Sequence, residues 1–400
     1  MATKKLYQDD VYQKTCEAEI LQVEKEEDGT WLVFDQTVFA PEGGGQPSDR
    51  GTVLEAAAPL KTAKSAFIDR AEDRGDQVFH RLTEDPGFRT GDRVILSIDW
   101  AVRFDHMQRH LGEHILSGAF WRLFGGINRG FHMGEDGMTI DIAFEGDLPG
   151  GGRAEILPDD RLNPDGGLDD RDLPDRVTWE MAEAAEFEAN RVIQSDAPVS
   201  VRYFHTRDEA ARMPVRKAVA FDQEISVVTV GDPAAPLDCV CCCGTHPSSA
   251  GQVGLVKIYK IEPNKGMSRV YLEAGSRALV NAQRHFNLLY ELETALSAGD
   301  EDVLAKFRGR AEEEEAVHGQ LTALRRRVQT QEAAAIAAAP APFTCRTYED
   351  LSVDDLMQIG RKAAKGRAGL LVLAQVPDRT ALLFAGDGLD AGALDRKSVV

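Results

Sequence analysis

Two short motifs, far apart in the sequence, carry side chains that commonly bind metal ions. The first places His110 and His114 four residues apart, which is about one turn of a helix. The second runs from Cys242 to His246 and places a thiol and an imidazole at the same spacing. Three imidazoles and one thiolate form the mixed nitrogen and sulfur set that suits tetrahedral zinc. The sequence therefore predicts one zinc site, formed when the two motifs fold against each other.

The choice of thiol is open, because four of the six cysteines crowd into residues 239–243. Cys242 stands four residues before the histidine, but Cys239, Cys241 and Cys243 could replace it. Adjacent cysteines do not readily form unstrained disulfides, so the cluster favours a reducing compartment and a metal. Four protein ligands close the coordination shell. The predicted zinc is therefore structural, unless one ligand yields to water or substrate.

The same helix permits a different chemistry. Residues 110–114 match H-x-x-E-H, the inverted zinc-protease motif, in which Glu113 would be the general base. The third ligand would then be a downstream carboxylate, for which Glu183, Glu186 and Glu188 are available. This hypothesis leaves the second motif without a role and depends on a short pattern. We keep it as the less favoured alternative.

A glycine triplet, Gly43, Gly44 and Gly45, lies in the first quarter of the chain. Three consecutive glycines lower the stability of regular structure, because glycine loses much backbone entropy on folding. They are expected where the backbone approaches a ligand closely, and equally in a plain flexible turn. The triplet is therefore a candidate binding loop.

Composition limits the classes of protein that fit. A chain of 400 residues with 43% hydrophobic and 28% charged residues is typical of a globular protein of two or three domains. We find no run of about 20 apolar residues that would span a membrane, and no apolar segment of a signal peptide at the start. We therefore expect a cytoplasmic protein that does not enter a membrane.

The charge is unfavourable for binding nucleic acid through the average field. The chain has 66 acidic and 46 basic residues, which gives a formal net charge of -20. Nucleic-acid binding usually relies on basic surfaces, so local basic patches would have to supply it. Part of the acidic excess gathers in residues 147–175, which we expect to form a solvated insertion.

Local patterns predict an α+β fold. Short runs rich in β-branched and aromatic residues, divided by Gly-rich and Asp-rich turns, predict a small barrel-like β domain over residues 1–98. Residues 99–275 combine alternating segments with two predicted helices, over 99–124 and 179–195, and are expected to form an α+β domain that contains the zinc. The first of these helices carries both histidines on one face.

The last third of the chain has a different pattern. Residues 276–340 repeat leucine and valine at three- and four-residue spacings, which predicts an antiparallel helical hairpin with coiled-coil packing. One helix between two apolar strands then predicts a small α/β module over residues 341–400.

Three stretches resemble one protein family, in the same order along the chain. They are T-V-F-A-P-E-G-G-G-Q-P-S-D-R-G at 37–51, R-F-D-H-M-Q-R-H-L-G-E-H-I-L at 103–116 and C-C-G-T-H at 242–246. Over about residues 6–275 the chain resembles free-standing alanyl-tRNA editing proteins and the editing domain of alanyl-tRNA synthetase. The C-terminal part resembles, more weakly, the region of longer members that helps to bind tRNA. One departure is Glu113, where members commonly carry a small or neutral residue.

The resemblance implies a zinc-dependent hydrolase that cleaves the ester between a wrong amino acid, serine or glycine, and the tRNA for alanine. It implies that Thr37 senses the seryl hydroxyl and that Gln46 aligns a water molecule or the terminal adenosine. Arg103 and the glycine triplet are then candidates for contact with the substrate or RNA, and Glu113 is a candidate catalytic residue.

Such an activity answers a physical problem. A pocket that activates alanine cannot strongly reject glycine or serine, so a second site must remove the errors. Two alternatives remain: a non-catalytic zinc-containing module that only binds tRNA, and the zinc protease described above. A full synthetase is not expected, because too few residues precede the editing motifs for an aminoacylation domain. The sequence assigns neither a preference between serine and glycine nor an oligomeric state.

Overall fold

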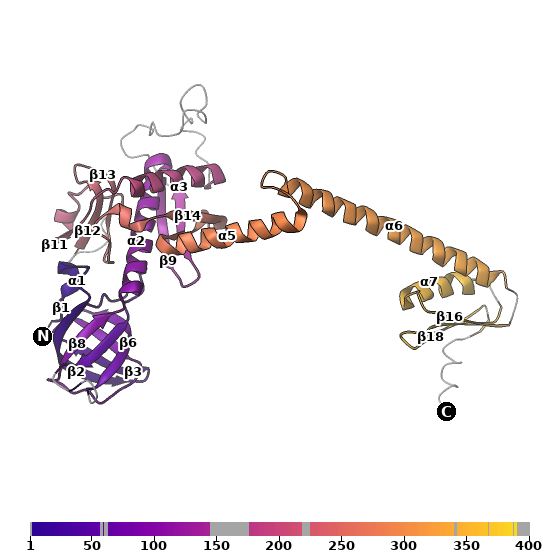
Figure 1. The fold of residues 1–400 in the computed structure, drawn as a ribbon, viewed down its shortest axis with the longest axis horizontal. Coiled ribbons are helices and arrows are strands. Elements are labelled where there is room, and N and C mark those ends of the chain that lie inside the picture. Colours follow the sequence, from indigo (N-terminus) through magenta and orange to yellow (C-terminus); the bar gives the residue numbers. More distant parts are fainter. Residues whose placement is uncertain are drawn as a thin grey trace, which may run out of the picture. The chain divides into compact units, whose positions relative to one another are not determined.

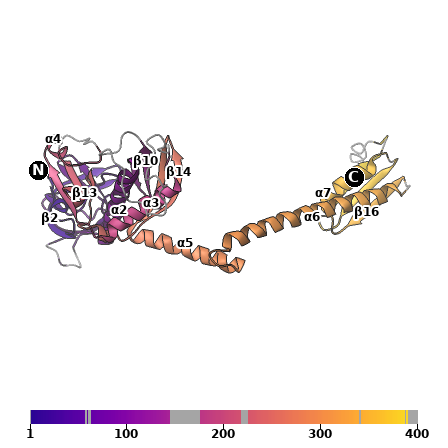
Figure 2. The same cartoon turned by 90° about the horizontal axis from the view of Figure 1, so that it is seen from above.

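The computed structural model describes residues 2–56, 59, 63–144, 176–217, 225–339, 342–366, 368–386 and 388–389. The chain forms two compact units, Met1–Phe286 and Asn287–Val400, which are drawn in Figure 1 and seen from above in Figure 2. The acidic insertion predicted at 147–175 lies outside the described residues.

A closed six-stranded barrel begins the first unit, as the sequence predicted. Its strands follow the order β2-β3-β7-β6-β5-β8. Their bounds are β2 (Thr15–Glu26), β3 (Gly29–Phe34), β5 (Gly51–Glu55), β6 (Ser65–Arg74), β7 (Gln77–Leu82) and β8 (Arg93–Ile98). Buried and exposed residues alternate along β2 and β8, because successive side chains of a strand point to opposite faces. A short strand β1 (Lys4–Lys5), a helical turn α1 (Leu6–Asp9) and β4 (Gln36–Thr37) lie beside it.

The long helix α2 (Trp100–Phe124) follows the barrel and confirms the helix predicted over residues 99–124. Asp99 caps its start, because its carboxylate accepts hydrogen bonds from the backbone N–H groups of Ala101 and Val102. Gly125 ends it in the left-handed conformation, with φ of 69°. Most of the helix is buried, so its polar residues face protein on nearly every side.

Two sheets complete the first unit around α2. A four-stranded sheet has the order β14-β15-β10-β9, and a three-stranded sheet has the order β11-β12-β13. The bounds are β9 (Gly126–Met133), β10 (Met138–Phe144), β11 (Val199–Phe204), β12 (Ile225–Asp232), β13 (Ala235–Cys241), β14 (Val256–Asn264) and β15 (Met267–Ala274). Helix α3 (Trp179–Gln194) shares one hydrophobic core with α2 and the larger sheet. Two short helical segments, α4 (Arg207–Ala210) and η1 (Ala250–Val253), connect these elements.

The second unit contains a long helix and a small α/β module. Helix α5 (Gly275–Leu296) crosses the boundary between the units, and α6 (Val303–Ala337) follows. The end of α6 packs on α7 (Val353–Ala364) and on the sheet β16-β17-β18 (Phe343–Tyr348, Leu370–Gln375, Thr380–Ala385). Apolar residues of the predicted hairpin seam, including Leu292, Leu321 and Leu324, are exposed. The coiled-coil packing and the four-part division of the chain therefore stay predictions. No helix in the described ranges is long and apolar enough to cross a membrane.

Candidate metal centre

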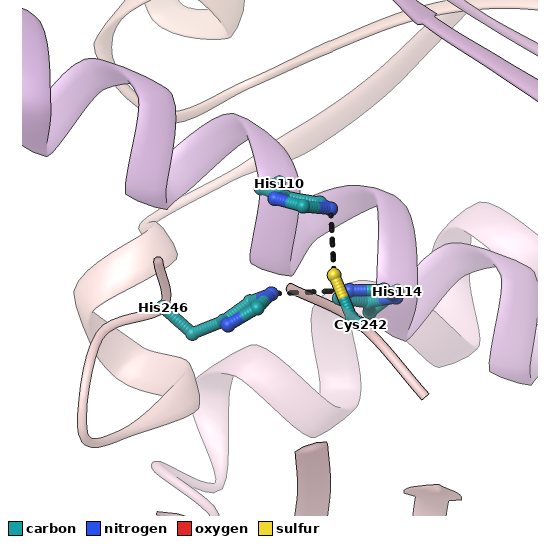
Figure 3. A group of neighbouring side chains, drawn as sticks. All are labelled: His110, His114, Cys242 and His246. Carbon is teal, nitrogen blue, oxygen red and sulfur yellow. Dashed lines mark hydrogen bonds between the residues drawn. The ribbon is translucent and has the colours of Figure 1, made fainter. Parts of the chain in front are cut away.

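Within the described part of the chain, one group of side chains has the make-up of a metal site. It consists of His110, His114, Cys242 and His246, and its four potential ligand atoms lie within 4.8 Å of one another. Helix α2 supplies the first two, and the loop after β13 supplies the other two (Figure 3). The tertiary structure thus joins the two motifs that the sequence paired, and Cys242 is the clustered cysteine that lies with the imidazoles.

The orientation of the four side chains fits a metal ion better than a hydrogen-bond network. His114 Nε2 lies 3.1 Å from His246 Nε2, and Cys242 Sγ lies 3.3 Å from His110 Nε2. Burial lowers the pKa of His110 to about 4, and it lowers the pKa values of His114 and His246 well below the usual range; it is the largest cause of the shift in all three. The three imidazoles are therefore neutral near pH 7. Burial also raises the pKa of the Cys242 thiol, so this group loses its proton only when a metal ion binds. The unprotonated imidazole nitrogens and the thiolate formed in this way make a donor set suited to zinc.

A glycine lets the two motifs approach each other. A Cβ atom on Gly244 would lie 2.3 Å from His110 Cε1, which is far below van der Waals contact. Any larger residue there would push the Cys242–His246 loop away from α2. The glycine between the cysteine and the histidine is thus a steric requirement of the cluster.

The glycine triplet forms a tight turn beside the cluster. The backbones of Gly43 and Gln46 exchange two hydrogen bonds, and Gly44 and Gly45 between them have φ of 62° and 83°. Positive φ at both central residues is the signature of a type I′ turn, which favours glycine strongly. The turn lies against protein rather than open space: a Cβ on Gly43 would meet Cys243 Sγ at 3.0 Å.

Gln46 ends this turn and reaches the cluster with its amide. Its Oε1 lies 2.8 Å from His110 Nδ1 and accepts a hydrogen bond from the backbone N–H of Thr245 at 3.0 Å. Its Nε2 donates to the Thr245 hydroxyl at 2.8 Å. The side chain is buried and both ends of the amide are occupied. Gln46 thus orients His110 with its Oε1, and its role in aligning a water molecule or the terminal adenosine stays a prediction.

Comparison with known proteins points to the same family as the sequence motifs. Residues 225–271 match the model for the threonyl and alanyl tRNA synthetase second additional domain. This stretch runs from β12 to β15 and contains Cys242 and His246.

Relatives match over a longer part of the chain. The alanyl-tRNA editing protein AlaX-L of Pyrococcus horikoshii is 29% identical over 281 residues, which are 69% of this chain and 59% of that protein. The alanyl-tRNA editing protein Aarsd1 of Mus musculus is 30% identical over 277 residues, which are 68% of this chain and 56% of that protein. The chain is similar to alanyl-tRNA editing proteins. The predicted resemblance is confirmed, although the chain spans less than two thirds of the length of these relatives.

One relative extends the similarity to the second unit. The alanine–tRNA ligase of Pyrobaculum aerophilum is 29% identical over 400 residues, which are 98% of this chain and 40% of that protein. The alignment therefore includes the second unit as well as the first, and it covers less than half of the longer ligase.

Arg103 lies in a different setting from the one predicted. Its guanidinium is fully buried, and Nε donates to Asp49 Oδ1 at 2.9 Å. The other nitrogens donate to the carbonyl oxygens of Val11 and Val38, at 2.9 and 2.7 Å, and again to Asp49. Asp49 in turn accepts from the backbone N–H of Ala40 at 2.7 Å. Arg103 therefore ties α2 to the base of the glycine-rich loop, and its guanidinium is not exposed to RNA.

Thr37 is also fully buried, and its hydroxyl contacts a histidine. Its Oγ1 lies 2.8 Å from His80 Nε2 and accepts from the backbone N–H of Phe39 at 3.1 Å. His80 Nδ1 lies 3.3 Å from the carbonyl oxygen of Leu32 and must be the protonated nitrogen, since a carbonyl only accepts. His80 Nε2 is then an acceptor, so the Thr37 hydroxyl donates its proton to His80. Only the remaining lone pair of Thr37 is left for a substrate hydroxyl.

Glu113 is buried next to His114, but it does not lie with the four potential ligand atoms. Its Oε1 accepts from Ser117 and Asn128, and its Oε2 faces His114 Nδ1, the nitrogen turned away from the cluster. Among the proposed carboxylate ligands, Glu186 is bound to Lys257 and Glu188 to Arg122 and Arg191. The arrangement gives no support to the protease hypothesis.

The sequence pattern did not reveal several residues that support the cluster. Thr245 fixes Gln46, Asn128 and Ser117 fix Glu113, and the ring of Phe131 stacks on His110 with centroids 5.4 Å apart. Threonine, asparagine, serine and phenylalanine are common throughout globular proteins, so their types and spacing carried no signal. His80 was missed because a single histidine on a strand is usually a core residue and gives no functional signal.

Proposed function

We propose that the chain is a zinc-dependent aminoacyl-tRNA deacylase that hydrolyses mischarged alanine tRNA, namely its seryl ester and also its glycyl ester. The observation that carries the proposal is the convergence of three imidazoles and one thiol on one point, in the region that matches alanyl-tRNA editing proteins. Zinc would be held by His110, His114, Cys242 and His246. A cytoplasmic location goes with this function and stays a prediction.

Bound zinc supplies Lewis-acid chemistry, or a water of lowered pKa, if one protein ligand yields its position. The residues around it have definite tasks. Gln46 holds the ring of His110, and the turn at Gly43–Gly45 closes one side against Cys243. These contacts hold the four ligand side chains in place before the substrate arrives. Less entropy is then lost when the substrate binds.

Incubation of the protein with seryl-, glycyl- and alanyl-tRNA(Ala) tests the activity directly. We expect the seryl ester, the glycyl ester or both to be hydrolysed faster than in buffer, while the alanyl ester persists. Equal persistence of all three esters would reject the deacylase. Tight tRNA binding in that case would favour the second candidate, a non-catalytic tRNA-binding module, which the closed set of four protein ligands also permits.

Thr37 is the proposed source of selectivity for serine. Thr37 is fully buried in this structure, so the proposal requires a rearrangement that lets the substrate reach its remaining lone pair. That lone pair would then accept a hydrogen bond from a seryl hydroxyl, whereas an alanyl methyl would leave it unpaired. Thr37→Val keeps the shape and removes the hydroxyl. We expect the ratio of seryl to alanyl hydrolysis to fall about ten- to a hundredfold, which corresponds to about 1–3 kcal/mol for a lost buried hydrogen bond. An unchanged ratio would exclude Thr37 as the sensor.

A further inference from the structure

We propose that Glu113 is a positioning residue that sets the protonation pattern and orientation of His114, so that His114 Nε2 can bind the metal. The inference rests on the zinc site of the proposed function and adds a residue outside the four ligands. Glu113 directly precedes His114 on α2, and it is 3% exposed. A buried carboxylate beside a ligand needs a structural explanation, because carboxylates are rarely buried without partners.

One carboxylate oxygen of Glu113 is held in place by two donors. Ser117 Oγ donates to Oε1 at 2.5 Å, and Asn128 Nδ2 donates to the same oxygen at 2.7 Å. Ser117 lies one turn further along α2, and Asn128 lies on β9, so the two donors approach from different elements. Asn128 Nδ2 also donates to Ser117 Oγ at 3.1 Å, which closes a small network. Oε1 is thus fixed, and with it the direction of Oε2.

The second oxygen faces the ring of His114. Oε2 lies 3.3 Å from His114 Nδ1, while His114 Nε2 on the other side of the ring lies 3.1 Å from His246 Nε2. His114 Nδ1 makes no hydrogen bond in this structure, so its contact with Oε2 is electrostatic. Charge still decides the tautomer, because a negative oxygen attracts a proton on Nδ1 and repels a lone pair there. The proton on Nδ1 leaves the lone pair of Nε2 free for the metal.

The formal charges point in the same direction. A divalent zinc ion with one thiolate and three neutral imidazoles has a net charge of +1 in a buried site. An uncompensated buried charge is strongly unfavourable. The Glu113 carboxylate brings the total to zero, and a carboxylate behind a histidine ligand is a recurrent way to orient the ring and raise its basicity.

Replacement by glutamine separates this role from a purely structural one. In Glu113→Gln the amide oxygen would stay at the Oε1 position, because Ser117 and Asn128 both donate there. The NH₂ group would then face His114 Nδ1. A donor opposite Nδ1 favours the tautomer with the proton on Nε2, which removes the lone pair that the metal needs. The isosteric variant should therefore bind zinc more weakly than Glu113→Ala.

The experiment measures zinc affinity of the full-length protein by competition with a chromophoric chelator, after metal removal. Loss of a partner behind a histidine ligand typically weakens metal affinity 10- to 100-fold. We expect a loss of about tenfold for Glu113→Ala and about a hundredfold for Glu113→Gln, within that range. If Glu113 only held α2 and β9 together, the zinc affinities of the two variants would have the opposite order, because glutamine keeps the shape of the side chain and the hydrogen bonds at the Oε1 position.

A double variant tests the mechanism by rescue. In Glu113→Gln with Asn128→Asp, the new aspartate accepts instead of donating, so the glutamine amide turns and its oxygen faces His114 Nδ1. Zinc affinity should rise again, to within about tenfold of the wild type. Asn128 Oδ1 also accepts from the backbone N–H of Gly130, and an aspartate oxygen keeps that bond. The rescue keeps the test valid if a single variant folds poorly.

Glu188→Gln is the matched control. Glu188 is as deeply buried as Glu113, but it lies on α3 and pairs with Arg122 and Arg191. The Glu188→Gln variant should bind zinc with the affinity of the wild type. Glu113→Gln with wild-type affinity, or with higher affinity than Glu113→Ala, would overturn the inference. Wild-type protein that binds no zinc would overturn the site itself, whereas zinc binding without ester hydrolysis would reject only the proposed activity.

Discussion

Replacement of Arg103 should destabilise the first unit strongly and should not act mainly on RNA binding. The side chain is fully buried and carries a charged partner, Asp49, and two backbone carbonyl partners. Removal of one member of a buried ion pair costs about 3–5 kcal/mol, because the other charge stays buried without compensation. Each stranded carbonyl adds about 1–3 kcal/mol, less where water enters the space. Arg103→Ala should therefore lower the free energy of unfolding by about 5–11 kcal/mol, with the lower values expected where water reaches the stranded carbonyls.

A double-mutant cycle in urea distinguishes this loss from general disruption. Asp49→Ala strands the guanidinium and the backbone N–H of Ala40 but leaves the two carbonyls bonded. Because one backbone group is stranded instead of two, it should cost about 1–3 kcal/mol less than Arg103→Ala. The double variant removes both charges, and its loss should be clearly smaller than the sum of the two single losses. The transition of the first unit is followed by tryptophan fluorescence, since Trp31 and Trp100 both lie in it.

The result that would refute this reasoning is simple to recognise. A loss below about 1 kcal/mol for Arg103→Ala would mean that the buried pair is not needed for folding. Weaker tRNA binding at unchanged stability would restore the original prediction that Arg103 contacts RNA. Strictly additive losses in the cycle would show that Arg103 and Asp49 do not act as a pair.

Three further predictions follow from other contacts. Gln46→Ala removes the acceptor of His110 Nδ1 and should weaken zinc affinity about 10- to 100-fold. Gln46→Glu keeps an acceptor and should bind zinc nearly as the wild type does. Equal zinc affinity in all three proteins would contradict the role of Gln46 in orienting His110. Burial lowers the pKa of His80 from 6.5 to about 4. Between these pH values His80 is protonated in the unfolded state and neutral in the folded state. The free energy of unfolding should therefore fall by about 3 kcal/mol as the pH drops from about 6.5 to 4. His80→Phe should reduce the slope of the stability curve in this pH range, measured by urea unfolding at each pH. It should not abolish the slope, because the pKa values of His110, His114 and His246 are lowered too. An unchanged slope would argue against a neutral His80. Arg325, Arg326 and Arg327 are exposed on α6. Replacement of all three by glutamine should weaken tRNA binding and reduce the salt slope by up to about one unit for each lost phosphate contact, and an unchanged slope would show that they are only a solvated helix face.

The sequence by itself predicted the three imidazoles, a thiol from the cysteine cluster and the helix that presents two of the imidazoles, whereas the tertiary structure placed Cys242 with them. Histidines four residues apart lie on one face of a helix whatever surrounds it, because the period of the α-helix is fixed. Few functions besides metal binding favour two imidazoles, a thiol and a third imidazole at such spacings. The barrel strands and α2 were predictable for a similar reason, since alternating burial and a capping aspartate act within short segments.

Only the tertiary structure decided what the polar residues around the ligands do. Arg103, Gln46 and Glu113 each lie in motifs that pointed to substrate or catalysis, yet each is buried and bonded to protein. The partners come from distant positions: Gln46 meets Thr245 across 199 residues, and Arg103 meets Asp49 across 54. A side chain's type gives its donors and acceptors, but not which remote groups will lie within hydrogen-bond distance of them. That choice is made by the packing of α2 between the barrel and the two sheets, and a role of these three side chains toward the substrate stays a prediction.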